Sequence, residues 1–283
     1  MIDVFRKNNQ LCSKHTTQHY STSFSLGVRA LDREYRRHIY NIYSFVRYAD
    51  EIVDSFFDFE QATLLREFTN DTWNAISRGI SLNPILDSFQ LTVNACRIDH
   101  DLIRAFLDSM EMDLHYTEYS PEDLGKYIYG SAEVVGLMCL RVFYANDDAT
   151  YEKLRYPARK LGEAFQKVNF LRDAQDDFAG KGRIYFKNID FNNFSSEEKK
   201  KIEDDIRFDF HEAYKGIVQL KKQVRFGVYL AYRYYYELFL KIARAQPDEI
   251  LQKRFRIPNR AKGVLLLKAS LRNKTGRMRK MDG

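Results

Sequence analysis

The sequence predicts an all-α protein. Apolar residues recur about every 3.6 positions along most of the chain, which is the spacing of one helix face. The 283 residues include only 13 Gly and 5 Pro, few for a protein rich in turns. No stretch of convincing length alternates polar and apolar residues as a half-buried strand does. No linker rich in Gly, Pro or Ser divides the chain, so a single domain over residues 1–283 is expected.

The expected helices follow one another along the chain. The helix over 31–57 places Ile42 and Val46 on one face. The pair Ser120-Pro121 marks another start, because Ser caps free amide groups and Pro suits the first helical position. The remaining helices are expected over residues 60–78, 84–96, 99–118, 121–145, 150–178, 195–224, 225–245 and 260–272.

The formal net charge of +6 is gathered at the C-terminal end, where a basic tail over about 268–283 is expected. The favoured interpretation is a solvated terminus. Contact with nucleic acid or with an anionic membrane surface is the alternative. The tail holds Lys268, Arg272, Lys274, Arg277, Arg279 and Lys280, opposed by Asp282.

The cysteines and the absence of long apolar runs bear on location. Cys12, Cys96 and Cys139 are odd in number and far apart, which indicates reduced thiols rather than a disulfide framework. No apolar run reaches the roughly 18 residues that span a bilayer. The chain also begins without the apolar stretch of a signal peptide. We expect a cytoplasmic protein, with peripheral contact at a membrane surface as the open alternative.

Two aspartate pairs are the most informative feature of the sequence. Asp50 and Asp54 are four residues apart, and so are Asp173 and Asp177. On a helix this spacing places both carboxylates on one face, where like charges repel. A hard divalent cation relieves the repulsion, because Mg²⁺ binds carboxylates together with substrate phosphates. Two such helices facing each other could hold a diphosphate.

Basic and amide residues beside the pairs strengthen this interpretation. Each aspartate helix carries an arginine, and guanidinium groups bind phosphate oxygens bidentately. One such helix alone would be a solvated charged face, whereas two favour a functional site. The neighbours are Arg47 at the first pair and Asn169, Arg172, Asp176, Arg183 and Tyr185 at the second.

Other sites have weaker support. His15 and His19 have the spacing of zinc ligands, but no cysteine or carboxylate completes a diagnostic set. Glu111 and His115 lack the spacing of di-iron helices, so the three histidines are interpreted as surface residues. No phosphate-binding loop or dinucleotide fingerprint occurs, and no helix carries the basic stripe of a nucleic-acid interface.

Several sequence blocks together resemble the squalene and phytoene synthase family, the head-to-head prenyl-diphosphate synthases. The resemblance covers about 20–267, and one block, YIYGSAEVVGLM, is nearer to bacterial phytoene synthases. It implies an isoprenoid-synthase helical bundle around a central cavity. The blocks are YSTSF (20–24), RYADEIVD (47–54), MEMDL (110–114), YIYGSAEVVGLM (127–138), QKVNFLRDAQDDFAGKGRIYF (166–186) and, more weakly, RFRIPNRAK (254–262).

The resemblance also implies roles for individual residues. Mg²⁺, with Mn²⁺ as a substitute, is expected on Asp50, Asp54, Asn169, Asp173 and Asp177. Contacts to diphosphate oxygens are expected from Arg47, Arg172, Arg183, Tyr185, Ser21 and Ser23. The aspartates, together with Tyr127, Gln166 and Tyr235 near the reacting carbons, are the expected catalytic residues.

The reaction implied is that of a phytoene synthase. Two geranylgeranyl diphosphates would condense through prephytoene diphosphate to phytoene, a carotenoid precursor, with release of two diphosphates and no NADPH. A small Val28, one turn after Phe24, leaves room for the C20 chain. The alternatives are a C30 squalene or dehydrosqualene synthase using farnesyl diphosphate and, outside enzymes, a helical membrane-associated scaffold.

Overall fold

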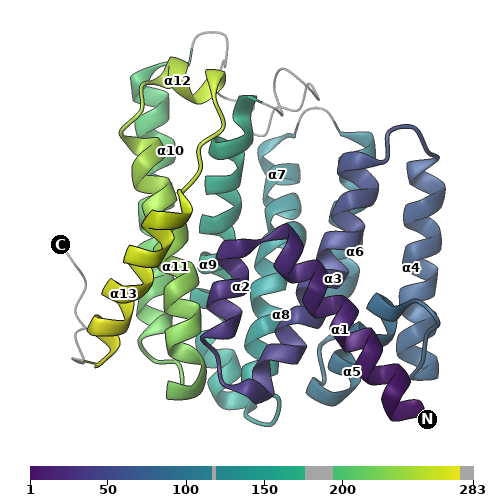
Figure 1. Cartoon of the computed structure of the whole chain (residues 1–283). Coiled ribbons are helices and arrows are strands. Elements are labelled where there is room, and N and C mark those ends of the chain that lie inside the picture. Colours follow the sequence, from purple (N-terminus) through teal and green to yellow (C-terminus); the bar gives the residue numbers. More distant parts are fainter. Residues whose placement is uncertain (117–118, 176–193, 275–283) are drawn as a thin grey trace.

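The computed structural model describes residues 1–116, 119–175 and 194–274, and every regular element within these ranges is a helix (Figure 1). The prediction of an all-α fold is confirmed. The elements are α1 (Ile2–Tyr20), α2 (Thr22–Arg29), α3 (Arg33–Ser55), α4 (Gln61–Arg78), α5 (Pro84–Cys96), α6 (His100–His115), α7 (Pro121–Ile128), the π-helix η1 (Tyr129–Glu133), α8 (Val134–Phe143), α9 (Asp148–Gln175), α10 (Ser196–Ile217), α11 (Lys222–Ala243), α12 (Pro247–Gln252) and α13 (Asn259–Lys274).

Capping residues explain several helix starts. Asn83 accepts hydrogen bonds from the amides of Ile85 and Leu86 ahead of α5, which spans the predicted range. Ser120 accepts from the amide of Asp123 at the start of α7. These oxygens satisfy amide groups that have no partner within the helix.

The helix expected over 121–145 is interrupted. One turn of π-helix, η1, separates α7 from α8. The amphipathic pattern continues across the interruption, so periodicity alone could not predict it. π-turns occur often at functional sites, and Ser131 and Ala132 of η1 line the central cavity.

Three helices, α1, α2 and α12, have no counterpart among the expected ranges. The buried face of α1 is polar, with Asn9, Ser13 and Thr17 turned inward. Asn9 Nδ2 donates to Asp87 Oδ2 of α5 at 2.9 Å, so α1 packs through hydrogen bonds rather than an apolar stripe. The short α12 begins at Pro247, because proline suits the first position of a helix.

The long helices stand side by side and enclose an interior space. α3 and α9 run in the same sense, and their C-terminal ends lie at the same upper end of the bundle in Figure 1. The buried apolar residues form one large cluster around α3 to α8, another around α9 to α13, and a small third one that joins α7 to α9 through Tyr127 and Phe170. Within the described ranges, every helix is too short or too polar to cross a membrane.

Candidate functional site

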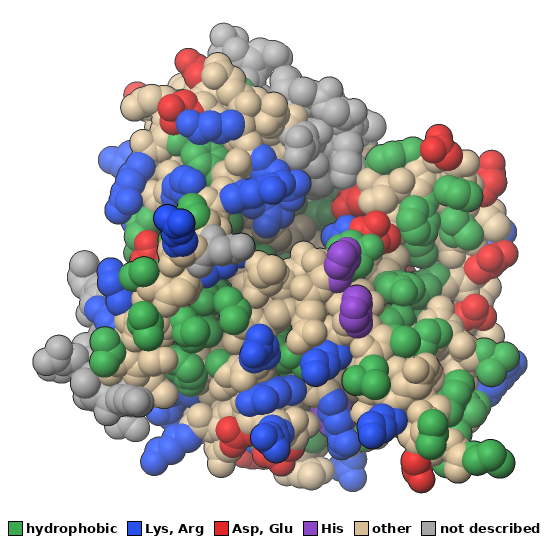
Figure 2. All heavy atoms as spheres, viewed as in Figure 1, with side chains coloured by type: hydrophobic (Ala, Val, Ile, Leu, Met, Phe, Trp, Pro, Cys, Tyr) green, Lys and Arg blue, Asp and Glu red, His purple; other side chains and the backbone are tan. Residues whose placement is uncertain are grey.

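A cavity of about 650 Å³ lies between the two apolar clusters. Its wall is built from α2, α3, α6, α7, η1, α8, α9, α10 and α11, so residues far apart in sequence share one space. The volume falls within the range of about 300–1,000 Å³ that is common for ligand sites. Figure 2 shows the surface hollowed above the middle of one face, with charged side chains beside the hollow.

One end of the cavity carries most of the charge. Asp50 and Asp54 line it from the last turns of α3, and Asn169 and Asp173 line it from the last turns of α9. The predicted meeting of two carboxylate helices is therefore observed. Ile39 of α3 lines the apolar part of the cavity eleven residues before Asp50. At 1.5 Å rise per residue, the cavity extends about 16 Å along α3.

Two arginines hold Asp173. Arg172 Nε lies 2.9 Å from Asp173 Oδ1 and Nη2 lies 2.5 Å from Oδ2, while Arg254 Nε lies 2.8 Å from Oδ1. Burial lowers the pKa of Arg172, but hydrogen bonds and charge at Asp173 and Tyr235 outweigh it, so the pKa is raised. Both cations line the cavity, so the aspartate and the two guanidinium groups form one charged unit at this end.

Arg47 connects the first pair to its surroundings. Its Nη1 lies 4.0 Å from Asp50 Oδ2, its Nη2 pairs with Glu51, and its guanidinium lies 4.6 Å from the centre of the Tyr20 ring. The buried Nε of Arg47 has no hydrogen-bond partner among the described residues. A buried donor without a partner is costly and is satisfied when an anion binds beside it.

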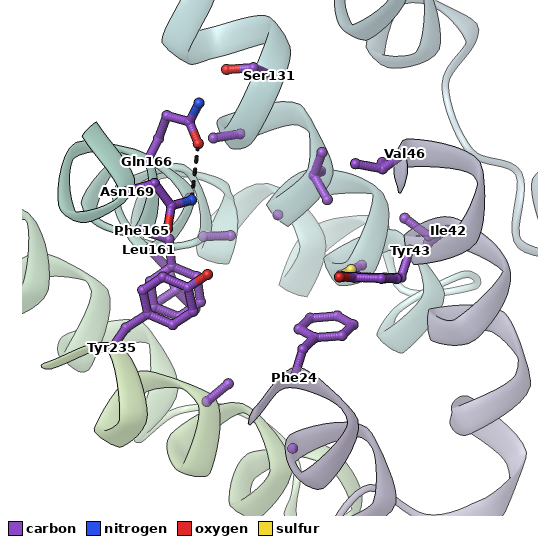
Figure 3. Close-up of a pocket in the computed structure, with 18 of the residues that line it drawn as sticks. Phe24, Ile42, Tyr43, Val46, Ser131, Leu161, Phe165, Gln166, Asn169 and Tyr235 are labelled. Carbon is purple, nitrogen blue, oxygen red and sulfur yellow. Dashed lines mark hydrogen bonds between the residues drawn. The ribbon is translucent and has the colours of Figure 1, made fainter. Parts of the chain in front are cut away.

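Two amides on α9 face the same space (Figure 3). Asn169 Nδ2 donates to Gln166 Oε1 at 3.4 Å, while the buried Asn169 Oδ1 has no partner in the described part of the chain. A carbonyl oxygen left open beside carboxylates suits a hard cation. In the ranges described, no three His, Cys, Asp or Glu side chains are close enough to hold a metal by themselves.

Tyr127 is fixed by a buried carboxylate. Asp113 accepts from the Tyr127 hydroxyl at 2.9 Å and from the Tyr119 hydroxyl at 3.0 Å. Asp113 and Tyr127 both line the cavity. The pairing gives the tyrosine one orientation, as expected for a group that must lie at a defined place near a substrate.

Aromatic rings cover the middle of the cavity from two sides (Figure 3). Phe24 of α2 stacks on Tyr43 of α3, with centroids 4.8 Å apart. Phe165 of α9 stacks on Tyr235 of α11, with centroids 3.8 Å apart. Burial raises the pKa of Tyr43 to about 12, so its hydroxyl stays protonated near neutral pH. Such rings present π faces to a cationic ligand and exclude water.

The model of the squalene/phytoene synthase family matches residues 17–261 of this chain. The chain belongs to this family. A phytoene synthase of Arthrospira platensis is 29% identical, with 93% of this chain and 92% of that protein covered. A 4,4'-diapophytoene synthase of Staphylococcus haemolyticus is 27% identical, with 72% of this chain and 70% of that protein covered. The crystal structure of a ligand-bound dehydrosqualene synthase shares the fold with a TM-score of 0.80, at 20% identity over 95% of this chain and 98% of that one.

Membership of the squalene/phytoene synthase family makes this chain a prenyltransferase that acts on prenyl diphosphates. The prediction of the enzyme class is confirmed, and the scaffold alternative loses its support. The family therefore fits what the cavity offers: carboxylates and arginines at one end and apolar and aromatic walls beyond them.

The structure brings most of the predicted site residues together. The serines are the exception within the described ranges: Ser21 caps α2 by accepting from the amide of Phe24 at 3.2 Å, and neither it nor Ser23 lines the cavity. Four residues lie outside the described ranges, namely Asp176, Asp177, Arg183 and Tyr185. Those that line the cavity are Arg47, Asp50, Asp54, Tyr127, Gln166, Asn169, Arg172, Asp173 and Tyr235. The roles assigned to all of them remain predictions.

Sequence reasoning gave no role to Arg254 or Asp113. Arg254 begins the weaker RFRIPNRAK block, and Asp113 belongs to the MEMDL block. Both blocks carry the family resemblance, but neither of these residues was assigned a role in the site. The interpretation of His15, His19 and His115 as surface residues agrees with their exposure.

Proposed function

We propose that this chain is a phytoene synthase, which joins two geranylgeranyl diphosphates head to head and releases both diphosphates. The observation that carries the proposal is the single cavity, which combines a charged end on α3 and α9 with a long apolar remainder. A prenyl diphosphate has the same division, with an anionic head and a hydrocarbon chain. The relatives named phytoene synthase support the same conclusion.

Mg²⁺ is the cation that this site would hold, and the residues present fit it. No three of its described carboxylates are close enough to hold an ion alone, so Mg²⁺ would be held by one or two of Asp50, Asp54 and Asp173 together with oxygens of the substrate diphosphate. The open Oδ1 of Asn169 supplies a further neutral oxygen. We expect Asp177 to complete the set from the sequence pattern. When bound, Mg²⁺ would neutralise charge on the diphosphate and so favour its departure.

The arginines would bind the diphosphate head. Arg172 and Arg254 now share Asp173, and an incoming diphosphate offers them additional oxygens at the same place. Arg47 would bring its open Nε to the other side of the head. Donors placed before the reaction stabilise charge that develops on the leaving group without reorganising during the step.

Loss of the first diphosphate leaves an allylic cation, which the double bond of the second substrate attacks. A proton then leaves to the released diphosphate, and a cyclopropylcarbinyl diphosphate results. The second diphosphate departs, the skeleton rearranges, and loss of another proton gives a conjugated triene. The stacked pairs Phe24–Tyr43 and Phe165–Tyr235 would shield these cations from water. No hydride donor takes part in this sequence, so no NADPH is expected.

The apolar end of the cavity supports the longer of the two possible substrates. Val28 lines it with 2% of its surface exposed, one turn after Phe24. A valine at this place leaves space that a phenylalanine would fill, which favours the C20 substrate. The second candidate is a C30 enzyme acting on farnesyl diphosphate, which the relative named 4,4'-diapophytoene synthase supports.

Product analysis distinguishes these candidates. The protein is incubated with Mg²⁺ and either farnesyl or geranylgeranyl diphosphate, with and without NADPH, and the product is identified by its mass. Phytoene from geranylgeranyl diphosphate, unchanged by NADPH, is the expected result. A C30 hydrocarbon made in preference would refute the assignment of chain length. A product that retains one diphosphate would refute the second half of the reaction.

A further inference from the structure

A basic groove lies on the outer surface of α1, α2 and α3, away from the carboxylates of the cavity. It encloses about 530 Å³. Figure 2 shows Lys and Arg side chains gathered below the middle of the face, over the lower parts of these helices. The basic residues that line the groove are Lys7, Lys14, Arg29, Arg33, Arg36 and Arg37.

Among the described residues, no acidic side chain forms an ion pair with the basic groove. No Asp or Glu lines it, and none of its six basic residues pairs with an acid in the described part of the chain. Asp32 and Glu34 lie in the same segment but outside the lining. Arg36 Nε donates to the carbonyl of Leu31 at 2.7 Å, which ties the arginine to the turn between α2 and α3. Unpaired cations this close together attract a polyanion.

An apolar side chain lies among these cations. Leu11 lines the groove with 53% of its surface exposed, and Val4, seven residues earlier, is 73% exposed. Lys7 and Lys14 share this face of α1, because residues three, four and seven apart on a helix lie above one another. Exposed apolar side chains flanked by lysines suit a surface of anionic lipids, because the phosphates attract the cations while the apolar groups enter the boundary with the acyl chains.

Only one layer of chain separates the basic groove from the apolar end of the cavity. Val28, Leu31 and Ile39 line the cavity, whereas their neighbours Arg29 and Tyr40 line the groove. A lipid surface against the groove would therefore lie next to the part of the enzyme that holds hydrocarbon, at the end opposite the diphosphates.

We propose that the basic groove is the surface by which this enzyme docks on an anionic membrane. Lipid headgroup phosphates would lie between the arginines, and Leu11 and Val4 would enter the acyl boundary. The proposal holds for either substrate length, because it depends on the outer face of α1 to α3 and not on the reaction product.

Vesicle sedimentation tests the proposal with three variants that each lose four positive charges. The groove variant is Lys7→Gln/Lys14→Gln/Arg29→Gln/Arg33→Gln, which changes only exposed residues. The surface control is Arg66→Gln/Lys200→Gln/Lys201→Gln/Arg244→Gln, whose residues are exposed and lie outside the groove. The tail control is Lys274→Gln/Arg277→Gln/Arg279→Gln/Lys280→Gln.

The native protein should bind vesicles that contain phosphatidylglycerol and should bind pure phosphatidylcholine vesicles far less. Each basic residue near an anionic surface strengthens binding measurably, so the groove variant should bind on the order of 10- to 100-fold more weakly. Both controls should retain most of the binding. Leu11→Gln should weaken binding without any change in charge, which separates insertion from electrostatic attraction.

Turnover of substrate dispersed in detergent should be the same for the native protein and the groove variant, since none of the four residues lines the cavity. Equal loss of binding in the groove variant and the surface control would overturn the proposal, because binding would then depend on the net positive charge of the protein and not on the groove. Loss in the tail control alone would overturn it in favour of the C-terminal tail. A native protein that ignores both kinds of vesicle would also overturn it, in favour of an acidic protein as the occupant of the groove.

Discussion

The ion network between α9 and α10 should contribute measurably to stability. Asp209 of α10 is fully buried, and its carboxylate accepts from Lys160 Nζ at 2.8 Å and from Lys167 Nζ at 2.6 Å. Glu163 and Asp205 also contact Lys167. Burial lowers the pKa of Lys167, but the three carboxylates outweigh it, so the pKa is raised and the residue remains charged in the folded protein. Asp209→Asn keeps the size of the side chain and removes its charge.

The size of the effect follows from what remains after the substitution. Breaking a buried pair costs about 3–5 kcal/mol when the other charge is left uncompensated. Lys167 keeps Glu163 and Asp205, so the lower end, about 3 kcal/mol, is expected. A chain of 283 residues has an unfolding entropy of about 0.6 kcal/mol/K. The melting temperature should therefore fall by about 5 °C.

Thermal unfolding followed by circular dichroism measures this shift. Asp204→Asn is the matched control, because Asp204 is an exposed neighbour on the same helix and forms no ion pair with a described residue. Surface substitutions of this kind usually change stability by less than about 0.5 kcal/mol, so the control should melt within about 1 °C of the native protein. If Asp209→Asn melted as the control does, the network would have no energetic consequence, and the reasoning would be refuted.

Three further predictions concern the site and the pH dependence of stability. Asp50→Asn should reduce turnover by at least about 100-fold with an unchanged helical spectrum. The control Asp58→Asn changes an exposed residue beyond α3 and should keep its turnover. Equal turnover in the two variants would show that the Asp50 carboxylate takes no part in the reaction. Val28→Phe should shift the ratio of kcat/KM from geranylgeranyl towards farnesyl diphosphate, and an unchanged ratio would contradict the role of this position. Burial lowers the pKa of His38 to about 4, so its contribution to stability is complete above pH 6.5 and is lost as the pH falls towards 4. His38→Gln should reduce the acid-induced loss of stability, by up to about 3 kcal/mol in urea unfolding at pH 4 against pH 7.

The sequence was sufficient for the parts of the fold that depend on local pattern. The starts of α5 and α7 follow from Asn83 and Ser120, each placed before a proline. Repulsion between like charges on one helix face pointed to a bound cation at each aspartate pair, and the structure places Asp50 and Asp173 on the same cavity. What could not be predicted depends on packing between distant segments.

Arg254 shows why part of the site was missed. It follows α12, 81 residues after Asp173, and reaches that aspartate only through the path of the chain between α12 and α13. Nothing in its own segment identifies a partner. Asp113 was missed for the same reason, because its hydrogen bonds to Tyr119 and Tyr127 form only after α7 turns back against α6.

The contact between α9 and the η1–α8 segment limits how substrate length can be set. Gly162 and Gly136 lie where a Cβ atom would come within 2.5 Å of the Ala132 carbonyl and 2.8 Å of the Ala158 carbonyl, respectively. All four residues line the cavity, so this part of its wall is backbone. Larger side chains here would push α9 away and displace Asn169 and its neighbours together with the wall. We therefore expect substitutions that change substrate length without disturbing the charged end to lie elsewhere on the wall, as Val28 does at the apolar end.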